Sequence, residues 1–154
     1  MFEVHLYIET DSKCIRPTKG CWGYVLEYKT PSDRIFTKCE VGCEVGSDKR
    51  LLLAAVEKAS RRIAKESHVI VHTDTPFLLN TFNEWIHEWK KNSWLAAGGK
   101  EVKNRDLLQK IVENLHIKEL TAQEDKSHSY RAWLLMEMTK AELVENQTKE
   151  IKAE

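Results

Sequence analysis

The feature that most constrains this sequence is the order in which its strand-like and helix-like segments follow one another. Residues 3–10 alternate apolar and polar side chains with the two-residue period of a β-strand, and residues 22–28 and 34–41 also read as strands. Beyond them, helix-like and strand-like segments alternate. Strands joined by short turns pair antiparallel, whereas parallel neighbours need a crossover such as a helix. The order therefore predicts an α/β fold: one mixed five-stranded sheet with helices on both faces.

Capping residues mark the expected helices. Ser47 or Asp48 is a suitable N-cap for a helix that we expect through about residue 65. Thr75-Pro76 places proline at a first helical position and predicts a helix to about Lys91. The remaining expected elements are strands over residues 68–72 and 117–121, a helix over 104–114 and a final helix from about Ser129.

The chain has 154 residues, a length that suits a single domain. We expect residues 1–140 to form that domain and residues 141–154 to form a charged C-terminal tail that is frayed or solvated. No apolar run approaches the roughly 20 residues of a membrane span, and we see no signal peptide. A cytoplasmic protein is therefore expected, and the sequence is silent on its oligomeric state.

Charge and cysteine content limit the kinds of partner. Lysine and arginine number 24, as do aspartate and glutamate, so a nucleic-acid partner would have to be held by a local basic patch. The four cysteines, Cys14, Cys21, Cys39 and Cys43, include no CxxC pair. Their spacing is unlike that of zinc ligands, and we expect reduced thiols.

Three stretches between residues 72 and 108 carry a specific pattern: His72-Thr-Asp-Thr-Pro, Asn83-Glu-Trp-Ile-His-Glu-Trp-Lys-Lys-Asn-Ser-Trp94 and Val102-Lys-Asn-Arg-Asp-Leu-Leu108. Together they resemble the bacterial ribonuclease HI family. In that family a strand ends in Thr-Asp-Ser and leads into a helix and a basic protrusion with tryptophans at the same spacings, followed by Val-Lys-Asn-x-Asp-Leu. The resemblance implies the ribonuclease H fold, binding of RNA–DNA hybrid, and hydrolysis of the RNA strand with Mg²⁺ or Mn²⁺.

The implied chemistry needs a group of carboxylates around two divalent cations. The family draws them from the first strand, the first helix, the end of the fourth strand and the last helix. Asp74 matches the fourth-strand position. Either Asp11 or Glu9 fits the first strand, because side chains two apart lie on the same side of a strand. His128, in Lys126-Ser-His, resembles a family histidine that assists proton transfer or product release.

Two positions depart from the family pattern. Leu51 stands at the glutamate position of the first helix, and Trp133 stands at the aspartate position of the last. Glu57 and Glu137 lie too far along their helices to replace the missing ligands. We therefore expect at most one weakly bound Mg²⁺ or Mn²⁺, and an apolar plug of Leu51 and Trp133 over the site.

The expected nucleic-acid surface keeps more of the family pattern than the metal site does. Four lysines, Lys90, Lys91, Lys100 and Lys103, gather in sequence around Trp85, Trp89 and Trp94, and such a patch suits phosphates. By resemblance, Trp85 and Asn104 line the groove for the DNA strand. We interpret the chain as a ribonuclease H-type domain that binds RNA–DNA hybrid and has weakened endonuclease activity. The alternative is a catalytically inactive nucleic-acid-binding or protein-interaction module on the same fold.

Overall fold

One sheet of five strands organises the computed structural model, which describes residues 2–96 and 98–153 and the side chains up to residue 147. Its strands are β1 (Phe2–Thr10), β2 (Thr18–Lys29), β3 (Ile35–Gly46), β4 (Ser67–Thr73) and β5 (Ile117–Glu124). Their order is β3-β2-β1-β4-β5, with β1 parallel to β4, β4 parallel to β5 and the other pairs antiparallel. The predicted mixed sheet is confirmed.

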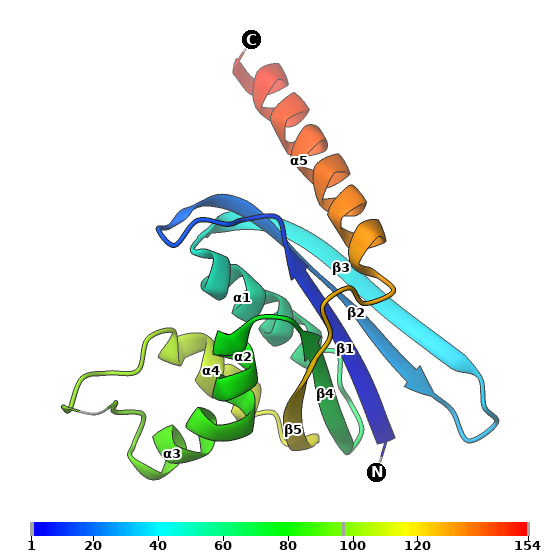
Figure 1. The fold of residues 1–154 in the computed structure, drawn as a ribbon. Coiled ribbons are helices and arrows are strands. Elements are labelled where there is room, and N and C mark those ends of the chain that lie inside the picture. The colour runs from blue at the N-terminus through cyan, green and yellow to red at the C-terminus, as the bar shows by residue number, and fades with distance from the viewer. Residues whose placement is uncertain (1, 97, 154) are drawn as a thin grey trace.

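Helices cover both faces of this sheet (Figure 1). On one face lie α1 (Asp48–Ser60), α4 (Arg105–Val112) and a helical segment made of α2 (Pro76–Asn80), the π-helix η1 (Thr81–Trp85) and α3 (Ile86–Lys91). On the other face α5 (Arg131–Ala153) crosses the sheet and extends beyond it. The loop between α3 and α4 projects away from the body of the protein.

The two faces of β1 differ in polarity, as strand alternation requires. Val4, Leu6 and Ile8 are buried in the main core beneath α1. The alternate side chains of β1 lie on the α5 face, where Leu134 and Met138 of α5 pack with residues of β2 in a smaller apolar cluster. The α5 face therefore has a small apolar contact at one end and polar side chains elsewhere.

The helical segment after β4 is interrupted by the π-helix. Ile86 donates its amide to the carbonyl of Thr81, five residues earlier, and Phe82 and Ile86 remain buried. The Thr81 hydroxyl is buried without a hydrogen-bond partner among the residues described. The sequence predicted one helix over 75–91. Its extent is correct, but the π-turn was missed because apolar periodicity does not reveal one extra residue in a turn.

The C-terminal segment is helical. Residues 141–153 continue α5, and Glu145 pairs with Lys19 of β2 at 2.9 Å. The expectation that this segment is frayed or solvated stays a prediction. The boundary at residue 140 stays a prediction. Among the residues described, no helix is long and apolar enough to cross a membrane.

We predict that the smaller cluster holds α5 on the sheet. Leu134 is fully buried, whereas Leu143 of the same helix is 57% exposed. Leu134→Ala should lower the free energy of unfolding by about 2–5 kcal/mol, since it removes apolar contacts and leaves a cavity. Leu143→Ala, the matched control, should change it by no more than about 0.5 kcal/mol. Urea titration measures both, and equal effects would contradict this packing.

Candidate catalytic and nucleic-acid-binding site

Parallel pairing of β1 with β4 brings two predicted site carboxylates to one end of the sheet. Tyr7 is the register partner of His72. Beyond this pair β1 runs on to Thr10 and β4 to Thr73, so Glu9 and Asp74 lie toward the same end of the sheet. Asp74 is exposed, and no hydrogen bond or ion pair of the described residues involves its carboxylate.

Glu9 is held by two groups of the α5 region. Its Oε1 lies 3.1 Å from His128 Nε2 and 3.7 Å from Arg131 Nε, and its side chain is 17% exposed. His128 is buried, and its Nδ1 accepts the amide of Tyr130. The proton of a neutral His128 ring therefore sits on Nε2, where it is donated toward Glu9 or the carbonyl of Ile8. His128 thus ties the start of α5 to β1, and a role in proton transfer stays a prediction.

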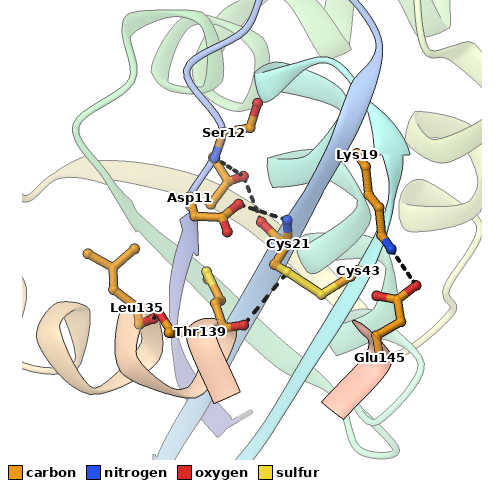
Figure 2. Close-up of a disulfide and its surroundings, with 10 residues drawn as sticks. Asp11, Ser12, Lys19, Cys21, Cys43, Leu135, Thr139 and Glu145 are labelled. Atoms are coloured by element: carbon orange, nitrogen blue, oxygen red, sulfur yellow. Dashed lines mark hydrogen bonds and ion pairs between the residues drawn. A yellow bond between two sulfur atoms is a disulfide. The ribbon is translucent and has the colours of Figure 1, made fainter. Parts of the chain in front are cut away.

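Asp11, the other first-strand candidate, is turned toward β2 (Figure 2). Its Oδ1 accepts the amide of Cys21 at 2.8 Å, while the Asp11 amide donates to the carbonyl of Cys21. Thr10 donates its hydroxyl to that same carbonyl at 2.7 Å. Asp11 therefore closes the β1–β2 pairing. Which of Glu9 and Asp11 is the first-strand carboxylate of the site stays a prediction.

The prediction of four reduced thiols is wrong for one pair. Cys21 and Cys43 form a disulfide between β2 and β3, and the two residues are register partners with Cα atoms 4.0 Å apart (Figure 2). Cys14 and Cys39 are free and exposed. Spacing in the sequence could not reveal the pair, because it follows from the register of β2 against β3.

Leu51 fills the position expected of the first-helix glutamate. It is fully buried, and a Cβ built on Gly20 would come within 2.9 Å of its Cδ1 and 3.4 Å of Asp11 Oδ1. The leucine therefore packs against the start of β2 near Asp11, and a side chain at residue 20 would crowd Leu51 and Ser12.

Trp133 is more exposed than Leu51. It lies in the first turn of α5 and is 40% exposed, and the neighbouring Met136 is 52% exposed. The apolar plug of Leu51 and Trp133 over the site stays a prediction.

These side chains do not fit a two-metal centre. Among the residues described, no three His, Cys, Asp or Glu side chains are grouped so that they could hold a metal ion. Two of the four expected ligand positions carry Leu51 and Trp133, and Glu9 already contacts His128 and Arg131. Mg²⁺ and Mn²⁺ require several oxygen ligands, which this arrangement lacks.

The predicted nucleic-acid residues lie at the end of η1, on α3, on the projecting loop and at the start of α4. Trp85 is 39% exposed and its ring is 5.9 Å from that of Trp89, which is partly buried. Trp94 is 9% exposed and belongs to the core. The four lysines of the patch are all exposed: Lys90, Lys91, Lys100 and Lys103. Trp85 and the lysines therefore form the accessible part of this surface, and Trp94 anchors the loop beneath them.

Asn104 is held in place by a partner from α1. It has a left-handed backbone, with φ of 63°, and its Oδ1 accepts a hydrogen bond from Arg50. Arg50 also makes a two-pronged contact with Asp106, at 3.1 and 2.7 Å. The hydrogen bond from Arg50 lowers the pKa of Asp106 below its ordinary value. This network fixes the start of α4 against α1 and leaves Asn104 on the same side as the basic loop.

Comparison with known proteins identifies the family of this chain. The family model described as RNase H matches residues 3–132. The chain is 32% identical over 127 residues to Ribonuclease H of Idiomarina loihiensis, covering 82% of this chain and 77% of that protein. This chain belongs to the ribonuclease H family.

Solved structures show the same fold. A type 1 ribonuclease H with the type 2 active-site motif matches with a TM-score of 0.71 and 19% identity, covering 92% of this chain and 72% of that one. A foamy viral protease-reverse transcriptase in complex with RNA/DNA hybrid matches with a TM-score of 0.61 and 13% identity. That match covers 91% of this ribonuclease H domain and 20% of the viral protein.

The α5 face also carries a series of hydrogen-bonded polar side chains that sequence patterns did not predict. His5 Nδ1 lies 2.8 Å from His72 Nε2, His72 Nδ1 lies 3.0 Å from Asp125, and His5 Nε2 lies 2.9 Å from Glu3. Tyr7 stacks on His72 at 4.3 Å. The residues come from β1, β4 and the segment after β5, so only the sheet topology brings them together.

The contact between the His5 and His72 rings limits how many protons the two rings can carry. Two facing ring nitrogens share a hydrogen bond only when one of them lacks a proton. Burial lowers the pKa of His72 from its ordinary value, and the charges of His5 and His128 act in the same direction, against the hydrogen bond of Asp125. A fully charged His72 is therefore unfavourable in the folded domain.

We predict a pH dependence of stability from His72. Its lowered pKa means that the unfolded chain binds the proton more tightly, so stability rises with pH from the folded pKa up to about 6.5, the unfolded value. His72→Gln should reduce this slope by at most about 1.4 kcal/mol per pH unit. Urea titrations between pH 5 and pH 7 would measure it, with the exposed His87→Gln as control. Equal slopes in both variants would contradict the role of His72.

Proposed function

We propose that this ribonuclease H domain binds RNA–DNA hybrid on the surface formed by α3, the projecting loop and the start of α4, and that its metal-dependent cleavage of the RNA strand is strongly weakened. The observation that carries the proposal is the contrast between the two halves of the site. The basic and aromatic surface is accessible, whereas Leu51 and Trp133 occupy two ligand positions.

Charge and aromatic surface support the binding half of the proposal. The four exposed lysines at positions 90, 91, 100 and 103 can contact phosphates, and binding through phosphates releases counterions. Trp85 adds an accessible ring, packed against Phe77 and Trp89. Lys49 lies 5.0 Å from the Phe77 ring and extends the positive charge onto α1. A structural neighbour of this domain is a viral protein in complex with RNA/DNA hybrid, which agrees with this partner.

The geometry at Glu9 supports weakened cleavage. An ion pair with Arg131 and a contact with His128 already compensate the charge that a metal would neutralise. We propose that at most one Mg²⁺ or Mn²⁺ binds, weakly, at the end of the sheet where Glu9 and Asp74 lie. In this proposal Asp11 has a structural role and His128 positions α5.

The cytoplasmic location expected from the sequence remains part of the proposal. Cytoplasmic thiol systems keep most cysteines reduced, so the Cys21–Cys43 disulfide would form there only under oxidation.

We predict that hybrid binding depends on the lysine patch. Replacing the four lysines at positions 90, 91, 100 and 103 by Ala should weaken binding and flatten the dependence of log affinity on log salt by at most about 3.6, taking about 0.9 for each phosphate contact. Fluorescence anisotropy with a labelled hybrid at several salt concentrations measures both quantities.

The control replaces four exposed lysines outside the patch, at positions 29, 110, 126 and 140. It changes the net charge by the same amount and should leave the salt slope within about one unit of the unmodified protein. If both variants lose the same slope, binding follows overall charge and the proposed surface is wrong.

We predict that carboxylates at residues 51 and 133, the two positions that depart from the family pattern, restore metal dependence. Leu51→Glu with Trp133→Asp should destabilise the domain in chelator, because burying a carboxylate without a partner is strongly unfavourable. Added Mg²⁺ or Mn²⁺ should recover the loss, since a ligand that binds only the folded state stabilises it. Thermal melts with and without metal, followed by cleavage of labelled hybrid, give the result.

The matched control is Leu51→Gln with Trp133→Asn, which has the same shape without the charges. It should show neither the recovery with metal nor a gain in cleavage. Asp74→Asn added to the restored variant should abolish both. A restored variant that folds but gains neither property would show that the site is misplaced, and strong cleavage by the unmodified domain would show that it was never weakened.

A further inference from the structure

A cavity of about 370 Å³ lies at the end of the sheet where β1 and β4 begin. Phe2 and Ser67, the first residues of these strands, line it. Asp74 follows the opposite end of β4, and seven residues of strand span about 20 Å. The cavity is therefore separate from the candidate site, and its volume lies in the range of small-molecule sites.

The inner wall of this cavity is apolar and aromatic. Val4, Leu26 and Ile63 line it and are buried, with exposed fractions of 3–7%. Tyr28 and Phe36, register partners on β2 and β3, stack with ring centres 5.7 Å apart. Phe36 is 44% exposed, so part of an aromatic ring is open to a ligand.

Positive charge surrounds the apolar wall. Lys38 comes from β3, and Arg62 and Lys65 come from the segment between α1 and β4. None of the described residues that line the cavity is acidic, although the chain as a whole has equal numbers of basic and acidic residues. Arg62 donates to the Tyr24 hydroxyl and to the carbonyl of Cys39, which holds its guanidinium in place. The cavity therefore favours a negatively charged ligand.

We propose that this cavity binds a small organic anion: a flat apolar body against Val4, Leu26 and Ile63, with a carboxylate or phosphate directed to Lys38, Arg62 and Lys65. Charge alone is insufficient here, because exposed cations bind a hydrated anion weakly. The apolar wall supplies the remaining affinity through burial of the ligand body, so both parts of the ligand are needed.

The probes are 2-naphthoate, the uncharged 2-naphthalenemethanol and inorganic phosphate, titrated into the ¹⁵N-labelled domain at low salt and followed by NMR. Naphthoate should shift the amides of Val4, Leu26 and Ile63. The alcohol should bind at least about fivefold more weakly, because it lacks the charge. Phosphate alone should leave these amides unshifted, because it lacks the apolar body.

Variants then separate the two parts of the site. Lys38→Gln with Lys65→Gln should weaken naphthoate at least about fivefold and leave the alcohol unchanged. Phe36→Ala should weaken both aromatic probes. The control is Lys110→Gln with Lys126→Gln, which removes two exposed lysines outside the cavity and should change neither.

Four results would overturn the proposal. Naphthoate and the alcohol binding equally would leave the cations without a role. Phosphate binding as tightly as naphthoate would leave the apolar wall without one. Shifts confined to residues outside the cavity, or equal losses in the lysine variant and its control, would place the anion elsewhere.

Discussion

The parallel pairing of β1 with β4 is the interaction on which the rest of this structure depends. It joins residues 2–7 to residues 67–72 in the middle of the sheet and buries Leu6 and Val71 in the main core. Because the two strands run in the same direction, their carboxyl ends lie together, with Glu9 near the end of one strand and Asp74 directly after the other. Their amino ends meet at the opposite edge and form part of the cavity. The register of β1 against β4 therefore decides which residues meet at each end of this strand pair.

Charge balance at Glu9 explains how the domain keeps its fold with an incomplete ligand set. A carboxylate that is mostly buried needs a compensating charge or strong hydrogen bonds. A metal ion supplies that compensation where enough carboxylates surround it. Here Arg131 and His128 compensate the charge of Glu9 from within the chain. Leu51 is a buried apolar side chain at one of the two positions that depart from the family pattern. The folded state is therefore balanced without an ion.

Polar contacts also determine where α5 lies. Only a small apolar cluster around Leu134 and Met138 joins it to the sheet. At its start, the Tyr130 hydroxyl donates to Glu27, and this hydrogen bond, with burial, raises the pKa of Tyr130 to about 12. Further along, Glu145 pairs with Lys19 (Figure 2). These contacts place the first turn of α5 so that Trp133 stays partly exposed, whereas Leu51 on α1 is buried in the main core.

The sequence by itself determined the order of elements, the mixed sheet and the family, because strand and helix periods, capping residues and the tryptophan spacing are local properties. It also predicted Asp74 as a site residue and the departures from the family pattern at Leu51 and Trp133. It missed the disulfide and the His5–His72 pair, and it did not indicate that residues 141–153 continue α5. Each of these depends on which residues of different strands lie opposite one another, or on what covers a helix. Only the tertiary structure decided them, because strand register and burial are set by contacts between residues that are far apart in the chain.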